Sequence, residues 1–544
     1  MLRIKQKMVS ASLCCLLPSA VLAQLPEGGV RQDAPSQDAA VQVQQKQWLD
    51  ILSEEERSSE KNENVGEPTV VGDDFLAANP RILEDALIQA LNGNSVDLVS
   101  SLAALYRKQP NHNPKLIARA DALLAKLKGR TSEAVERYRT LYESDVSDDR
   151  ILLDLAAAEF QDYRLGEAAA HFRHATQRDI PAPVLENVKR FQEAVKRQTE
   201  WKWSGGISPV HSDNANNAAP RYCIETRGQT ACSVTVPVSA NGLNYELNTE
   251  KLTPLYGHHA VKFRANLSGT SYFFDRQSAY DDAFGRAYLG WQRKDGKQTV
   301  SVLPFYQAQL AGSSEFDSKK ENNRRAAPYM LAHGVGVQLL HMVNLGKATQ
   351  LYYSLERYRQ NYRETDRALR NDGWHDSTYL SLARRFGRTT LFGGWQYNRF
   401  VPENKNIRNA VNNAAYRRSG FNIGWIQQWP FGGGLNSRLT ASFANRRYKG
   451  IMAFGTEPQR NRERSLSVSL SHDKLSYKGI TPTLNYGYSR IRSNAPYARR
   501  SSHQWSLELN GIFKNSRKFG CVDLRVLIQL LHRSLQCKRC QQRP

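Results

Sequence analysis

Ser465-Leu-Ser-Val-Ser-Leu-Ser471 alternates a serine with an aliphatic residue at every step. In an extended chain Leu466, Val468 and Leu470 lie on one face and the serines on the other. A soluble sandwich can produce one such strand. Similar segments recur from residue 201 to 513, however, and a transmembrane β-barrel alternates lipid-facing and lumen-facing residues along every strand. We therefore predict a barrel over 201–513.

The spacing of these segments indicates how the barrel is connected. Fourteen strand candidates start near residues 201, 242, 260, 285, 298, 329, 348, 377, 389, 419, 435, 465, 481 and 503. Short turns such as Lys294-Asp-Gly-Lys297 alternate with longer polar intervals such as 311–328. Bacterial barrels have tight periplasmic turns, long outer loops and an even strand number. The expected fold is a 14-stranded antiparallel transmembrane β-barrel with both ends on the periplasmic side.

The two faces of the predicted strands differ in chemistry. Phe263 and Leu267 fall on the face expected to meet lipid, and Lys262, Arg264 and Asn266 on the face expected to line the lumen. The lumen is thus predicted to be polar, basic and wet. The sequence leaves open whether a loop plugs it.

The chain is basic, with 75 Lys+Arg against 52 Asp+Glu and a net charge of +23. The excess lies in residues 201–519, which hold 45 basic and 21 acidic side chains, whereas 1–200 hold 25 and 30. A basic protein suggests nucleic acid first. Here the basic residues fall in loops and on polar strand faces without any nucleic-acid motif, so no nucleic-acid partner is expected.

Residues 1–23 have the pattern of a secretory signal. Arg3, Lys5 and Lys7 precede a short apolar run, and small residues near the end predict cleavage after Ala23. Residues 24–74 are polar and poor in apolar side chains, which predicts a disordered lead. Because both ends of the barrel are expected on the periplasmic side, the domain that follows this lead is expected in the periplasm.

Residues 75–200 are predicted to be helical, and they repeat. A small residue, an aromatic four later and a small or apolar residue three further on recur after 34 residues, the period of tetratricopeptide (TPR) repeats. An ordinary helical bundle with chance similarity is the alternative. TPR stacks present a concave face for extended peptides, which predicts docking and not chemistry. The repeating positions, predicted to pack and shape the groove, are Ala134, Tyr138 and Leu141, then Ala168, Phe172 and Ala175.

Three features lie at the edges of the barrel. Cys223 and Cys232, in the first long loop, are predicted to form a disulfide because an exported loop is oxidised. The last strand resembles the insertion signal that the outer-membrane barrel assembly machinery reads. Residues 514–544 form an atypical basic, cysteine-rich tail, for which we hypothesise a frameshift product or an unusual extension. The residues of the insertion signal are Trp505, Leu507, Leu509 and Phe513.

The sequence shows no catalytic constellation. It contains no HExxH pair, GxSxG elbow, P-loop or dinucleotide fingerprint. No catalytic, cofactor-binding or metal-binding residues are therefore predicted, and an enzyme is not expected.

The order of signal, short TPR-like domain and fourteen-strand barrel resembles the surface lipoprotein assembly modulators, the Slam proteins, of Neisseria and related Gram-negative bacteria. The resemblance covers about 75–513 and rests on the 34-residue repeat and on segments such as Leu391-Phe-Gly-Gly-Trp-Gln-Tyr397 and Phe421-Asn-Ile-Gly-Trp425. It implies an outer-membrane protein that moves lipidated proteins to the cell surface without ATP hydrolysis. Implied partners are client surface lipoproteins, outer-membrane lipid, the barrel assembly machinery and periplasmic chaperones.

Two other functions stay open at this point. TPR domains also precede barrels that export polysaccharides, and a basic lumen would suit an anionic polymer. A general porin is the third candidate, but it leaves the helical domain unexplained.

Overall fold

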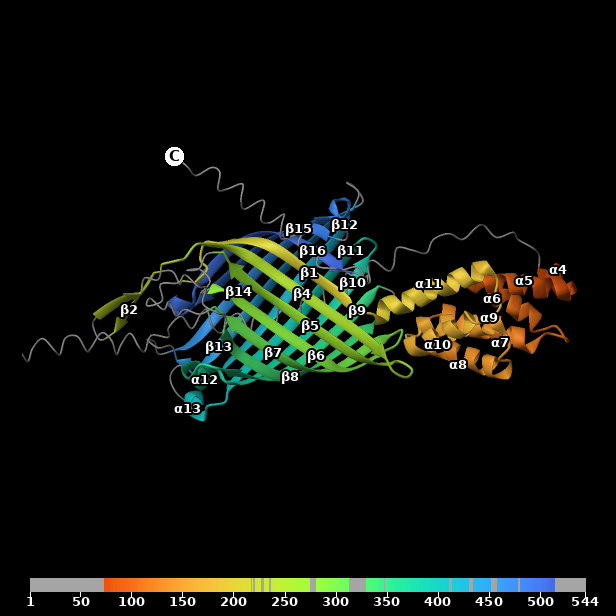
Figure 1. The fold of residues 1–544 in the computed structure, drawn as a ribbon, viewed down its shortest axis with the longest axis horizontal. Helices are drawn as coiled ribbons and strands as arrows, with labels where there is room; N and C mark the ends of the chain where they lie inside the picture. The colour runs from red at the N-terminus through yellow and green to blue at the C-terminus, as the bar shows by residue number, and fades with distance from the viewer. Residues whose placement is uncertain are drawn as a thin grey trace, which may run out of the picture.

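The computed structural model describes residues 73–513 except 217, 219–220, 227–228, 234–235, 274–279, 313–328, 347, 410–412, 430–433, 452–456 and 478–479. A stack of helices lies at one end of a closed β-barrel (Figure 1). The predicted signal cleavage after Ala23 and the cysteine-rich tail 514–544 lie outside the described residues.

The helical domain is a series of antiparallel helix pairs with clear start signals. Asn113 accepts a hydrogen bond from the Lys115 amide with Pro114 in the first turn, and Asp148 accepts from the Arg150 amide. Such caps stabilise a helix start by about 1 kcal/mol. The helices are α4 (Asp73–Ala78), α5 (Pro80–Gly93), α6 (Val96–Tyr106), α7 (Pro114–Leu127), α8 (Thr131–Ser144), α9 (Asp149–Gln161), α10 (Leu165–Ala175) and α11 (Ala182–Thr199).

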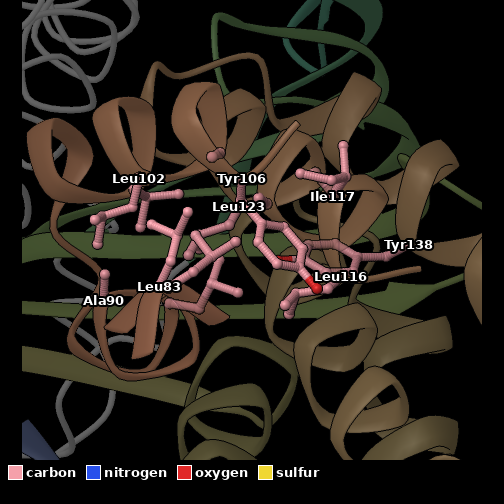
Figure 2. Close-up of a cluster of buried hydrophobic side chains, with 14 of the residues drawn as sticks. Leu83, Ala90, Leu102, Tyr106, Leu116, Ile117, Leu123 and Tyr138 are labelled. Carbon is pink, nitrogen blue, oxygen red and sulfur yellow. The ribbon is translucent and has the colours of Figure 1, made fainter. Parts of the chain in front are cut away.

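One hydrophobic core runs between the first six of these helices. Leu83 and Tyr138 are fully buried in it, and Figure 2 shows leucines of successive helices meeting around Tyr106. A second cluster joins α9, α10 and α11. Because Leu252 of the barrel packs against this second cluster, the helical domain and the barrel share part of their packing.

The barrel consists of fourteen strands within the described residues, each paired antiparallel with its neighbours. This confirms the predicted fold class. A separate hairpin, β2 (Tyr222–Thr226) and β3 (Gln229–Ser233), lies in the first loop. The barrel strands are β1 (Lys202–Ser212), β4 (Ala240–Pro254), β5 (His259–Tyr272), β6 (Asp282–Lys294), β7 (Gln298–Ala311), β8 (Tyr329–Asn344), β9 (Thr349–Tyr362), β10 (Gly373–Phe386), β11 (Thr389–Pro402), β12 (Tyr416–Trp429), β13 (Leu435–Ile451), β14 (Pro458–His472), β15 (Ile480–Ser493) and β16 (Arg500–Phe513).

The connections at the two ends of the barrel differ in length. The end next to the helices has short turns, such as the one between β4 and β5, where Gly257 has a φ of 57°. The opposite end has longer connections that carry α12 (Thr365–Asn371), α13 (Lys405–Asn409) and η4 (Pro496–Ala498). Among the described residues no helix is long and apolar enough to span a bilayer.

Some strands begin earlier than their apolar pattern. The alternation predicts a start near Ser465, but β14 begins at Pro458, and β16 begins at Arg500 and not near His503. The added residues are polar, Gln459 to Arg464 in β14. The strands therefore continue past the apolar band into the water-exposed end of the barrel, where the ladder no longer needs an apolar face.

Candidate functional surfaces: repeats, junction and barrel interior

The repeating residues of the helical domain pack between helices. Ala134 and Tyr138 of α8 and Ala168 of α10 are fully buried. Phe172 stacks on Phe191 of α11 with ring centroids 5.1 Å apart. Of the other predicted positions, Ala175 is buried and Leu141 is partly buried against the core. These six residues therefore shape the stack, and the surface offered to a partner is built by other side chains.

The helical domain docks on the barrel through a buried carboxylate that sequence reasoning missed. Asp162, in the turn between α9 and α10, has no solvent exposure. It accepts hydrogen bonds from Thr131 Oγ1 at 2.7 Å and from Arg164 Nε at 3.0 Å. His258 Nε2, from the turn between β4 and β5, lies 2.7 Å from its second oxygen. One carboxylate thus ties two helix turns to a barrel turn.

The electrostatics of this junction favour an ionised Asp162. Burial opposes the charge, but hydrogen bonds from His258, Thr131, Ser132 and Arg164 outweigh it and lower the pKa of Asp162 from 3.8 to about 2. The carboxylate is therefore charged at neutral pH and supplies a strong acceptor to its donors.

Further contacts surround this carboxylate. The Gly257 amide donates to Glu167 Oε1 at 3.2 Å, and Lys294 Nζ lies 4.1 Å from the centre of the Tyr163 ring. A side-chain carbon added to Gly166 would come within 3.0 Å of the Leu255 carbonyl oxygen. The helix turns therefore approach two short barrel turns closely, and the junction is a packed interface and not a loose tether.

A second buried carboxylate holds α8, α9 and α10 together. Glu159 of α9 lies 2.7 Å from His171 Nδ1 of α10 and 3.7 Å from Arg139 of α8. Arg139 also pairs with Glu167 at 2.9 Å. Burial raises the pKa of Glu159. This network fixes the last repeat directly behind the junction.

One side of the barrel interior is crosslinked by polar side chains. Arg286 of β6 pairs with Glu356 of β9 at 3.1 Å and donates to Gln307 of β7 at 3.0 Å. Gln338 of β8 donates to Glu356 at 2.7 Å and accepts from Arg264 of β5 at 3.2 Å. All five side chains are buried, so these contacts connect strands β5 to β9 across the lumen side.

A row of rings runs across the same wall, and the Arg286 guanidinium lies 4.2 Å from the centre of one of them, Phe305. Centroid separations between successive rings range from 4.5 Å, between His375 and Phe400, to 6.0 Å, between Phe305 and Tyr358. The row crosses neighbouring strands from β6 to β12. Its members are Tyr288, Phe305, Tyr358, His375, Phe400 and Tyr416.

Part of the opposite wall, on β14 to β16, is lined by hydroxyls and open to water. Strand alternation puts Ser465 and Ser467 of β14 on the inner face, because Leu466 between them faces out. Both serines are exposed, as are Ser489 of β15 and Ser502 of β16, whose hydroxyls lie 3.0 Å apart. Within the described residues, the lumen therefore has a stiff crosslinked wall and a wet hydroxyl wall.

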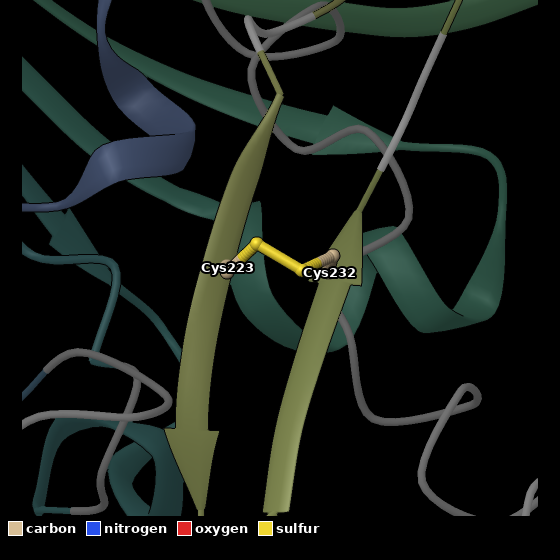
Figure 3. The surroundings of a disulfide bond; sticks show 2 residues. All are labelled: Cys223 and Cys232. Carbon is tan, nitrogen blue, oxygen red and sulfur yellow. A yellow bond between two sulfur atoms is a disulfide. The ribbon is translucent and has the colours of Figure 1, made fainter.

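The remaining predicted residues lie at the edges of the barrel. Cys223 and Cys232 are joined by a disulfide between β2 and β3 (Figure 3). Trp505, Leu507 and Leu509 of β16 face outward with exposures of 64%, 51% and 39%, and Phe513 pairs with Trp203 of β1.

Known proteins resemble both halves of the chain. A family model described as "Surface lipoprotein assembly modifier" matches residues 201–513, and one for the N-terminal TPR repeats of the same family matches 70–172. Surface lipoprotein assembly modifier 2 of Neisseria meningitidis serogroup B is 57% identical over 80% of this chain and 87% of its own length. The surface lipoprotein assembly modifier of Pasteurella multocida is 27% identical over 80% and 84%.

Among solved structures, the chain is similar to a deletion mutant of the monoaromatic hydrocarbon channel TodX. The match covers 58% of this chain and 90% of the TodX chain at 14% sequence identity. Its TM-score is 0.31, a likeness that carries no argument about function.

Proposed function

We propose, from the premise that this chain belongs to the surface lipoprotein assembly modifier family, that it passes lipoproteins through the outer membrane to the cell surface. It is an outer-membrane barrel protein, and its TPR domain fits the periplasmic side. The family match favours lipoprotein delivery over the polysaccharide exporter and porin alternatives. The role is one of assembly and transport.

The observation that carries the proposal is the junction at Asp162 and His258. This junction holds the last helical repeat against the short turns of the barrel. The Asp162 carboxylate lies 2.7 Å from His258 Nε2. A client polypeptide bound by the repeats is therefore presented at the periplasmic mouth of the barrel. A flexible linker would instead let the bound client diffuse away from the entrance.

The two inner walls fit the next step. The hydroxyl wall with Ser465 and Ser502 offers exchangeable hydrogen bonds to an unfolded or partly folded chain without binding one sequence tightly. The crosslinked wall around Arg286 and Glu356 keeps the cylinder rigid while the client passes. Folding of the client outside the cell then prevents its return and makes the step directional.

Other partners follow from the domain arrangement. We assign client binding to a periplasmic domain at 75–200, where periplasmic chaperones deliver the client. We assign membrane insertion to the barrel at 201–513, whose last strand, with Trp505, Leu507, Leu509 and Phe513, is presented to the barrel assembly machinery. The lipid that surrounds the barrel is that of the outer membrane.

Deletion of residues 75–198 tests this assignment. The barrel should still insert, shown by its heat-modifiable migration on gels, whereas protease shaving of intact cells should find the client lipoprotein hidden. Full-length protein in the same deletion strain is the control. Client exposure that is unchanged by the deletion would contradict the proposed role of the repeats, and a loss of capsule polysaccharide instead would favour the exporter.

A further inference from the structure

The barrel closes between its first and last strands through an incomplete ladder. β1 and β16 pair over five positions, from Trp203 with Phe513 to Ile207 with Leu509. β1 continues to Ser212 and β16 begins at Arg500, and both are described throughout. On its other side β1 pairs with β4 over its full eleven residues. The ladder between β1 and β16 therefore stops about halfway along the strands.

The chemistry of β1 is suited to a ladder that stops there. Pro209, two residues beyond the last pair, has no amide hydrogen to donate and faces outward. Within the paired stretch Gly205 lies opposite Gly511, so neither strand supplies a side chain that packs across the seam at this position. Among the described barrel strands this is the shortest ladder, and it should separate with the smallest loss of contacts.

The position of the unpaired half places it at one membrane leaflet. The paired half begins at Trp203, four residues after α11 ends, and thus lies at the periplasmic end. The unpaired half leads to Ser212 and Arg500, at the end with the long loops. The weak part of the seam is therefore at the level of the outer leaflet.

β16 separates two different environments beside this unpaired half. Trp505 and Leu507 face the lipid and are the most exposed of the apolar side chains described in this strand. Ser502 and Gln504, on the long-loop side of Trp505, face the lumen and are exposed as well. Separation of β1 and β16 here would open a path from the water-exposed hydroxyls inside the barrel to the hydrocarbon outside it.

We propose that the outer half of the β1–β16 seam opens sideways to pass the acyl chains of the client's lipid anchor from the lumen into the outer leaflet. The proposal rests on the proposed function, because a surface lipoprotein must bring both a polar chain and an apolar anchor across. The polypeptide stays against the hydroxyl wall, while the acyl chains leave the water-filled interior through the seam. The acyl chains then end in hydrocarbon and the polypeptide stays in water, which is the favourable environment for each.

The experiment locks the seam with a pair of cysteines on the same outward face of both strands. Pro209→Cys with Leu507→Cys bridges the unpaired half, and Ile207→Cys with Leu509→Cys, one outward pair closer to the periplasm, is the matched control in the existing ladder. A short bifunctional methanethiosulfonate reagent joins each pair and is removed by reductant. Heat-modifiability first confirms that both variants insert, and wild-type protein is treated in parallel because reductant also opens the Cys223–Cys232 bond.

Two forms of one client distinguish a block of acyl-chain passage through the seam from a block of the whole barrel. The first is the lipidated protein, and the second has its lipidated cysteine replaced and is exported by an ordinary signal. The bridge at 209 and 507 should reduce surface display of the lipidated form to the level of the deletion strain and leave release of the unlipidated form unchanged. The bridge at 207 and 509 should leave both unchanged, and reductant should restore display.

Unchanged display of the lipidated client under the 209–507 bridge would overturn lateral passage. So would an equal loss of both client forms, because that result places the polypeptide in the seam or blocks the barrel itself. Neither result touches the proposed function, which fails only if full-length and deleted strains display the client equally.

Discussion

The His258 ring nitrogen lies 2.7 Å from the Asp162 carboxylate, although 96 residues separate the two in sequence. The carboxylate is buried and also holds the first turn of α8 through Thr131 and Ser132. A single residue therefore couples the orientation of the last repeats to the periplasmic rim of the barrel.

Asp162→Asn should loosen this junction. The variant removes the charge that four donors surround, and the shift of the pKa from 3.8 to about 2 corresponds to about 2 kcal/mol of stabilisation. We expect faster proteolysis between the helical domain and the barrel and reduced client display. Asp121→Asn, which breaks the exposed pair with Arg107, is the control and should change neither.

The junction should also respond to acid in a defined direction. Because the folded pKa of Asp162 is depressed, its contribution is fully present above pH 3.8 and is lost as the pH falls through about 2. Limited proteolysis or hydrogen exchange of α10 should therefore show docking unchanged from pH 7 to 5 and loosening only below about pH 4. Loosening between pH 7 and 6 would contradict the carboxylate as the main anchor.

Arg286 and Glu356 should behave as a buried pair. Replacing either one alone leaves an unpaired charge and should cost about 3–5 kcal/mol, whereas Arg286→Met with Glu356→Leu should cost much less. The measurement is the urea concentration at which half of the barrel is unfolded, with heat-modifiable migration on gels as the readout of folding. Equal losses in single and double variants would show that the pair contributes favourable energy of its own.

Phe172→Ala tests the packing of the last repeat. The ring is buried and stacks on Phe191, so its removal should destabilise the helical domain by about 3–5 kcal/mol. Phe75→Ala, at an exposed site on α4, is the matched control and should leave the helical unfolding transition in place. Circular dichroism at 222 nm follows this transition, since the barrel contributes little helix.

The Cys223–Cys232 disulfide should affect the hairpin alone. Closing so short a loop stabilises it by about 2–3 kcal/mol. The double serine variant should therefore be cut faster between β2 and β3 by protease added to intact cells, while insertion and client display stay unchanged. A defect in insertion would show that the hairpin takes part in barrel assembly.

The sequence predicts those parts of the fold that depend on local periodicity. Leu466, Val468 and Leu470 predict a strand because every second side chain meets lipid, and the 34-residue repeat predicts Tyr138 and Phe172 at matching places between helices. The alternating loop lengths predict the strand count and both chain ends at one rim. These features depend on neighbours in sequence, so a single chain reveals them.

The junction and the lumen network depend on contacts that have no local pattern. Asp162 and His258 are of types common on surfaces, and nothing near either residue indicates a partner 96 positions away. Alternation puts Arg264 on the polar strand face, but the pairing of Arg286 with Glu356 follows from barrel closure. The early end of the β1–β16 ladder likewise depends on how the barrel closes. In the sequence only Pro209 indicates it.

If this chain moves lipoproteins through the outer membrane, the purified protein should do so in vesicles. The direct measurement is protease protection in vesicles that contain the purified, folded chain, with a lipidated client presented on the side of the helical domain. We expect the client to become digestible from the opposite side, and to stay protected with barrel residues 201–513 alone. A client that stays equally protected with and without the full-length chain would contradict it.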